Sequence, residues 1–101
     1  MSGPSWKNIY RLTDEQVSQL DAAEEAMEMM DINKAESILL QMHKENPKCV
    51  PVINNLAHMN GRYLSDFDKA IELYDLVLQI EPDNAWARDE RRRYQRYITY
   101  D

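Results

Sequence analysis

Two stretches of the chain are nearly alike: residues 31–47, DINKAESILLQMHKENP, and residues 66–82, DFDKAIELYDLVLQIEP. Each begins Asp-x-x-Lys-Ala, continues with apolar residues at the spacing of an amphipathic helix, and ends at a proline. The alanines, Ala35 and Ala70, are 35 residues apart, and the prolines repeat with the same step. Two landmarks that share one period predict an internal repeat.

The segment before the first repeat stretch has the signals of a helix. Thr13 and Gln16 form a capping box, and we expect the helix at about 14–29. Its apolar residues recur at helical spacing. They are Val17, Leu20, Ala23, Met27 and Met30. For the methionines of this helix, packing in the hairpin is favoured over an adaptable binding surface.

Asp31 caps a second helix, which Asn46-Pro47 ends. The later segments predict three further helices. Pro51 suits the first turn of a helix that Gly61 ends or loosens. Residues 60–65 indicate a longer loop. Ser65 or Asp66 caps the next helix, and Asp83 or Asn84 caps the last. Residues 1–13 are either a tail or, over 6–12, a short extra helix or arm.

The composition of the 101-residue chain is that of one soluble, all-α domain, with 44% hydrophobic residues, 30% charged residues and only two glycines. The net charge of −6 disfavours nucleic acid as a partner. No apolar run is long enough to span a bilayer, so no membrane partner is expected. A single cysteine, Cys49, makes no internal disulfide and is expected to be a buried thiol. A reducing, intracellular and therefore cytoplasmic setting is the expectation.

Over about residues 16–98 the chain resembles the tetratricopeptide-repeat family, whose period is 34 residues. The resemblance depends on small and apolar positions and on the prolines that end each unit. They are Ala35, Leu39, Pro47, Leu56, Ala57, Ala70, Tyr74 and Pro82. It implies antiparallel helical hairpins stacked as a short right-handed superhelix, with two hairpins in residues 14–82 and a capping helix in 83–101. The step of 35 residues is one longer than the family period, and the extra residue is expected in the 60–65 loop.

The same resemblance implies a protein–protein interaction module, an adaptor or scaffold, with a concave groove that receives a peptide or partner protein. Carried onto this chain, the groove face of the third helix offers Asn54, Asn55, His58 and Arg62. Asn55 matches a family asparagine that binds peptide backbone through its amide, although a structural or solvated asparagine is equally consistent with the sequence.

Family members that clamp the C-terminal carboxylate of chaperones use lysine, asparagine and arginine. Only Asn55 matches that clamp. The other clamp positions hold Leu20, Glu24, Trp86 and Glu90. Because two carboxylates would repel the ligand, a chaperone tail is excluded as the expected partner.

A second candidate surface is basic. Arg88, Arg92 and Arg96 recur every four residues and form a stripe on the last helix. A stripe of this kind can dock an acidic partner, because guanidinium groups bind carboxylates in a bidentate manner. RNA is a weaker alternative, and a solvated capping helix is the plainest interpretation.

No motif in the sequence indicates catalysis, a metal or a cofactor, so an enzyme is not expected. His43 and His58 lie on different predicted helices and are expected to be surface histidines. The acidic residues Asp21, Glu24, Glu25 and Glu28 are interpreted as a solvated helix face. Two alternatives remain: a structural subunit that self-associates, or a repeat fragment of a larger multidomain protein or enzyme.

Overall fold

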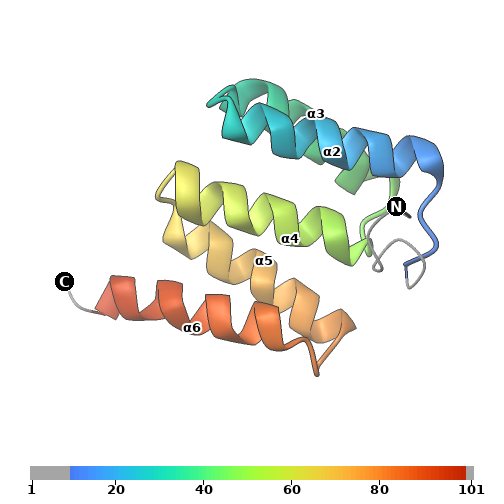
Figure 1. The fold of residues 1–101 in the computed structure, drawn as a ribbon. Coiled ribbons are helices and arrows are strands. Elements are labelled where there is room, and N and C mark those ends of the chain that lie inside the picture. The colour runs from blue at the N-terminus through green and yellow to red at the C-terminus, as the bar shows by residue number, and fades with distance from the viewer. Residues whose placement is uncertain (1–9, 100–101) are drawn as a thin grey trace.

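A computed structural model describes residues 10–99 of the chain as helices joined by short links (Figure 1). The elements, in chain order, are α2 (Asp14–Glu28), α3 (Ile32–Glu45), α4 (Val50–His58), the π-helical turn η1 (Met59–Tyr63), α5 (Phe67–Ile80) and α6 (Ala85–Thr99). The described part of the chain contains no strand, so the predicted all-α class is confirmed. Of the segment 6–12, only the last three residues are described, and the predicted helix or arm there lies otherwise outside the described residues.

The helices lie in three layers along the molecule (Figure 1). The layer at one end is the pair α2 and α3, the middle layer is α4 and α5, and α6 forms the other end. Consecutive helices pack on one another, and α6 packs on α5. The first helix begins at the predicted capping box, in which the Thr13 hydroxyl accepts from the Gln16 N–H at 3.1 Å.

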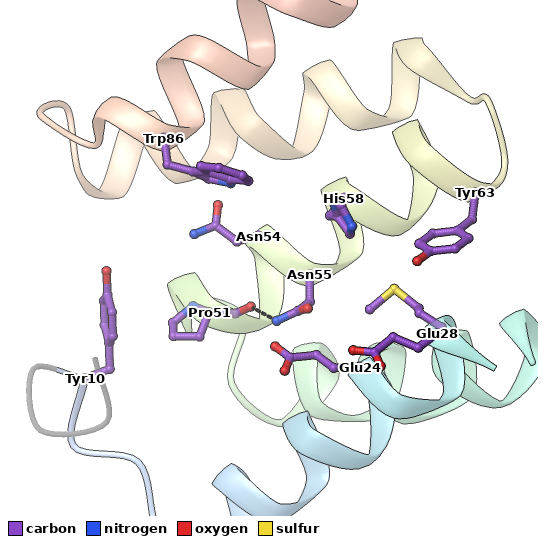
Figure 2. Close-up of a pocket in the computed structure, with 10 residues that line it drawn as sticks. Tyr10, Glu24, Glu28, Pro51, Asn54, Asn55, His58, Tyr63 and Trp86 are labelled. Carbon is purple, nitrogen blue, oxygen red and sulfur yellow. Dashed lines mark hydrogen bonds between the residues drawn. The ribbon is translucent and has the colours of Figure 1, made fainter. Parts of the chain in front are cut away.

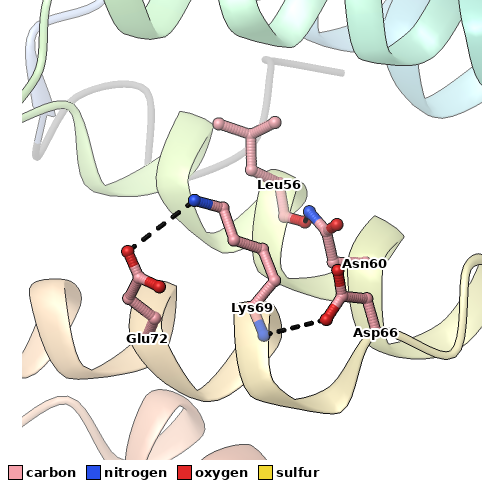
Figure 3. Close-up of polar contacts among 5 residues, drawn as sticks. All are labelled: Leu56, Asn60, Asp66, Lys69 and Glu72. Atoms are coloured by element: carbon pink, nitrogen blue, oxygen red, sulfur yellow. Dashed lines mark hydrogen bonds and ion pairs between the residues drawn. The ribbon is translucent and has the colours of Figure 1, made fainter.

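The repeated Asp-x-x-Lys-Ala sequence is an N-cap followed by a close helix contact. The Asp31 carboxylate accepts the Lys34 N–H at 3.3 Å, and 35 residues later the Asp66 carboxylate accepts the Lys69 N–H at 3.2 Å (Figure 3). A cap of this kind satisfies an N–H that the helix itself leaves unpaired. The alanine that follows each lysine is fully buried, which lets the two helices of each hairpin approach closely. The last helix begins in the same way, because Asn84 Oδ1 accepts the Ala87 N–H at 2.9 Å.

Both hairpin links turn through a residue with a left-handed backbone. Met30 has φ 62° and Ser65 has φ 54°, again 35 residues apart. After α2, the Met30 N–H bonds the Met27 carbonyl at 3.0 Å and the Asp31 N–H bonds the Ala26 carbonyl at 2.8 Å. These two bonds are a Schellman motif, in which glycine is the usual left-handed residue.

The packing prediction for the methionines of the first helix is correct only for Met27, which is buried. It is wrong for the two that follow, because Met29 is 75% exposed and Met30 is 67% exposed. The reason is that α2 ends at Glu28, and the chain then turns away from the helical path that would have carried these side chains into the hairpin.

The predicted loop over 60–65 is wrong for residues 60–63 and correct only for residues 64 and 65, which link η1 to α5. Residues 59–63 continue α4 as a π-helical turn, in which the Leu64 N–H bonds the Met59 carbonyl at 3.2 Å. The buried Asn60 supports the turn by donating its amide N–H to the Leu56 carbonyl at 2.8 Å (Figure 3). A π-helical turn closes its hydrogen bond over one more residue than an α-helical turn. A helical segment that contains such a turn therefore holds one residue more than a regular α-helix with the same number of turns.

Gly61 lies in this turn directly under the ring of Tyr94 from α6. A Cβ at position 61 would overlap the Cζ atom of Tyr94, because it would stand closer than non-bonded carbon atoms approach. Tyr94 is itself buried between Phe67 and Tyr74, with ring centroids 5.6 Å and 6.3 Å away. The absence of a side chain at Gly61 is therefore what lets α6 dock at this depth.

The core is continuous through all layers. Its largest fully buried side chains are Tyr74, Leu20, Leu39, Ile53, Met59, Val50, Val52 and Val77. Burial of each aliphatic side chain contributes about 1.5–3 kcal/mol. The prediction of a buried thiol is confirmed, since Cys49 lies in this core, and burial raises the pKa of the thiol. A raised pKa keeps the sulfur protonated and poorly nucleophilic.

Candidate functional site

An open groove of about 710 Å³ runs across α2, α4 and α6 (Figure 2). It is lined by Tyr10, Glu24, Met27, Glu28, Pro51, Asn54, Asn55, His58, Tyr63 and Trp86. Each of the helices α2, α4 and α6 contributes side chains, and η1 contributes Tyr63. The volume lies in the range typical of ligand sites, and the lining combines aromatic rings with a few polar groups.

Helix α4 forms the floor of the groove. Pro51, Asn54, Asn55 and His58 fall at i, i+3, i+4 and i+7, which places them on one face of the helix. The side-chain amide of Asn55 donates to the Pro51 carbonyl at 2.9 Å (Figure 2). Within the described structure the Asn54 Oδ1 atom is buried and accepts no hydrogen bond. A buried acceptor without a partner is uncommon in native proteins.

The α2 wall of the groove is acidic. Glu24 and Glu28 are four residues apart and therefore lie on one side of the helix. The pKa of Glu24 is raised, chiefly because the half-buried carboxylate is partly desolvated. An Asn55 hydrogen bond opposes this shift, while the charges of Asp21 and Glu28 add to it. In the free protein, this wall therefore presents crowded negative charge.

His58 stands at the middle of the groove beside Tyr63, with the two rings edge to face at 5.9 Å. Burial lowers the pKa of His58; the Glu90 charge opposes the shift and the Arg62 charge adds to it. At neutral pH the imidazole is thus uncharged and can donate one hydrogen bond while accepting another. The expectation of surface histidines holds only in part, because His43 and His58 are both half-buried.

The rims of the groove are aromatic. Trp86 of α6 is 55% exposed, which is high for an indole that lines a groove. Tyr10 also lines the groove, and its hydroxyl donates to Glu81 Oε1 at 3.0 Å. Burial and this carboxylate raise the pKa of Tyr10 to about 12, so the phenol stays protonated.

Three of the four residues assigned to the groove from the sequence meet there: Asn54, Asn55 and His58. The fourth, Arg62, is exposed and does not line it. In an α-helix Arg62 would follow His58 on the same face, but the segment after His58 is the π-helical turn η1. There, position i+5 replaces i+4 on that face, and Tyr63 takes the place expected of Arg62.

The arginine stripe lies away from the groove. Arg88, Arg92 and Arg96 are exposed, whereas Ala87, Glu90 and Tyr94 form the buried face of α6. Arg88 contacts the neighbouring Asp89 at 3.6 Å. A separate arginine, Arg91, is tied to Asp75 of α5 by a salt bridge and a hydrogen bond. Such exposed pairs contribute little stability.

Several groove residues escaped the sequence-based site assignment: Tyr10, Glu24, Met27, Glu28, Tyr63 and Trp86. A signal was present for two of them, because the family resemblance expected from the sequence aligns Glu24 and Trp86 with clamp positions. The other four had no such signal, because their positions in the groove depend on the tertiary structure. Among residues 10–99, no three His, Cys, Asp or Glu side chains are grouped as a metal site requires. No described helix combines the length and apolar composition needed to cross a membrane.

Comparison of the chain with protein-family models, curated proteins and solved structures gave no match. The assignment of a function therefore depends on the groove itself. Its features are an acidic wall on α2, a polar floor on α4 and an exposed indole on α6.

Proposed function

We propose that this chain is an interaction module of the tetratricopeptide type, an adaptor or scaffold that binds an extended segment of a partner protein in the groove. The proposal includes the right-handed superhelical stacking expected of that family. It is supported by cap and link geometry that recurs every 35 residues, at Asp31 and Asp66 and at Met30 and Ser65. A recurring hairpin unit is what a stacked repeat array requires.

The observation that carries the proposal is the exposed Trp86 facing the polar floor of α4 across an open groove (Figure 2). Indole rings are strongly enriched among residues that dominate binding energy, because they bury a large apolar surface with little loss of conformational freedom. A tryptophan kept half in water by the free protein gains burial when a ligand covers it.

The polar floor suits a peptide backbone. Asn54 Oδ1 is an acceptor without a protein partner in the described structure, so a ligand N–H adds a hydrogen bond without displacing one. The χ2 torsion of asparagine has broad minima, so a rotation of the amide can turn this oxygen toward a ligand. Neutral His58 can complete the pairing. Asn55 is the weaker candidate, because its amide N–H is already engaged by the Pro51 carbonyl.

The test is to select random dodecapeptides on the full chain and measure the affinity of the best binder by fluorescence anisotropy. Trp86→Ala and the double variant Asn54→Ala/His58→Ala should each weaken binding by about tenfold or more. The matched control, Arg92→Ala/Arg96→Ala, changes the arginine stripe and should leave the affinity unchanged. Loss of binding only in the stripe variant would place the binding site on the arginine stripe and not in the groove.

A second candidate function, self-association as a structural subunit, is favoured by the exposed apolar side chains near the end of α6. Tyr97 is 48% exposed and Ile98 is 38% exposed. In a longer array another helix would cover this end. Sedimentation velocity over a hundredfold concentration range tests the candidate. A concentration-dependent dimer that Ile98→Asp abolishes would favour it over the groove.

The proposed setting is the cytoplasm. The chain has one cysteine, Cys49, and it is buried and unpaired. A fold that needs no disulfide suits a reducing compartment.

A further inference from the structure

We infer that the groove selects partner segments carrying a lysine or arginine side chain, which the paired carboxylates of Glu24 and Glu28 receive. The inference deepens the proposed function and rests on it. It names the chemistry of the occupant: a cationic, extended segment of another protein. The charge of this occupant is opposite to that of the carboxylate ligands that lysine and arginine clamps bind.

The first support is the sign of the groove. Its lining includes two carboxylates and neither lysine nor arginine. The histidine on its floor has a pKa lowered by burial, so it adds no positive charge at neutral pH. The described cations nearest in sequence to groove residues, Arg11, Arg62 and Arg88, do not line the groove. An anionic, half-enclosed surface attracts cations and disfavours acidic segments.

The second support is geometric. Glu24 and Glu28 lie on adjacent turns of α2 and face the floor of α4 from one side of the groove (Figure 2). A guanidinium or ammonium group placed between them can bond both carboxylates. Met27 from the same wall and Trp86 from the opposite rim supply apolar surface. Long cationic side chains bury their methylene stems on such surface and also favour the faces of aromatic rings.

The third support is the strain that the carboxylates place on the free protein. Desolvation raises the pKa of Glu24, and the charges of Asp21 and Glu28 raise it further, against the Asn55 hydrogen bond. Helix α2 carries no lysine or arginine to relieve this crowding. Like charges four residues apart destabilise a helix. A bound cation removes the repulsion that the free protein tolerates.

The test uses the same dodecapeptide selection, read for composition. Peptides selected on the wild-type chain should be enriched in lysine or arginine, and the leading peptide should bind about tenfold more weakly to Glu24→Gln/Glu28→Gln. Replacing its cation by glutamine should cause a similar loss on the wild type and little further loss on that variant. Affinity for the wild type should fall as salt increases.

The matched control is Glu25→Gln/Glu72→Gln, which also removes two negative charges, but from exposed positions outside the groove. It should retain wild-type affinity. Thermal unfolding of all variants checks folding, and Glu24→Gln/Glu28→Gln should be at least as stable as the wild type, because it removes a desolvated charge and a repulsion.

The outcomes separate the two claims. Peptides that need Trp86 and Asn54 but show no enrichment in cations would overturn the inference and leave the proposed function in place. An equal loss of affinity in the control variant would overturn it too, because the effect would then be long-range charge. If no peptide binds through the groove, both fall. Self-association that Glu24→Gln/Glu28→Gln abolishes would replace the partner segment by a second copy of the chain.

Discussion

The two hairpins of this molecule begin their second helices in the same way and end their first helices differently. Asp31 and Asp66 cap α3 and α5 with the same hydrogen bond, and each link passes through a left-handed residue. Helix α2 ends as an α-helix in a Schellman motif, whereas α4 ends in the π-helical turn η1. The common part depends on local sequence, and the divergent part lies where α6 docks.

The position that most sharply separates the hairpins is Gly61, whose counterpart 35 residues earlier is Ala26. Ala26 carries a buried Cβ, while a Cβ at Gly61 would meet the Tyr94 ring. Gly61→Ala should destabilise the protein by about 3 kcal/mol and weaken the near-UV circular dichroism of the packed Tyr74 and Tyr94 rings. Urea unfolding measures the first effect. If the ring could move away, helix propensity would instead stabilise the variant by about 0.5–1 kcal/mol.

A matched pair of substitutions tests what the hairpins share. Ala35→Leu and Ala70→Leu each insert a large side chain into a fully buried contact between paired helices. Each should lower the free energy of unfolding by about 1–3 kcal/mol, and by similar amounts, in urea titrations. An unchanged melting temperature for Ala70→Leu would mean that this contact is not close-packed, and the repeat assignment would then be wrong.

The left-handed links offer a smaller effect of opposite sign. Met30 at φ 62° and Ser65 at φ 54° hold a conformation that glycine adopts without steric strain. Met30→Gly should stabilise the fold by up to about 1 kcal/mol, because the exposed methionine side chain contributes little packing. Ser65→Gly is its partner experiment. Destabilisation of both variants in thermal melts would show that the unfolded-state entropy of glycine outweighs the strain.

The smallest expected effect concerns charge, which also differs between the hairpins. Helix α2 carries six acidic residues, whereas α4 carries none. The folded-state pKa of Glu24 is raised above its unfolded value. Its contribution to stability is therefore complete below the unfolded pKa, near 4.3, and is lost as pH rises through the folded pKa.

Glu24→Gln should consequently gain stability relative to the wild type between pH 4 and pH 7. Urea unfolding at both pH values measures the gain. The same comparison with Glu25→Gln, an exposed neighbour, should show no such change. A constant difference across the pH range for Glu24→Gln would mean that the carboxylate is ordinarily solvated.

Much of the fold could be predicted because its signals are local. The capping box at Thr13, the repeated aspartate caps and the prolines after α3 and α5 placed the helices to within a few residues. The π-helical turn could not be predicted, because a glycine within a helical pattern indicates a helix end or a loop, whereas here Gly61 continues the helix under the ring of Tyr94, 33 residues later. Because the turn was not predicted, Arg62 was assigned to the groove, where the structure has Tyr63 instead.

The candidate site was predictable only in part for the same reason. Asn54, Asn55 and His58 lie on one α-helical face, and they could be assigned because the family resemblance pointed to that face of the helix. Glu24 was interpreted as part of a solvated face, because its partial burial and its hydrogen bond with Asn55 depend on tertiary structure. Tyr10 reaches the groove through a hydrogen bond to Glu81, 71 residues away, which no local pattern encodes.

The span of the groove has a consequence for how the ends of the molecule communicate. In a stack of helices each layer is held mainly by its neighbours, so a terminal helix such as α6 can open by itself at a low free-energy cost. An occupant that contacts Glu24 at one end and Trp86 at the other would be lost whenever α6 opens. Binding would therefore slow amide hydrogen exchange in α6 and join the terminal layers into one cooperative unit.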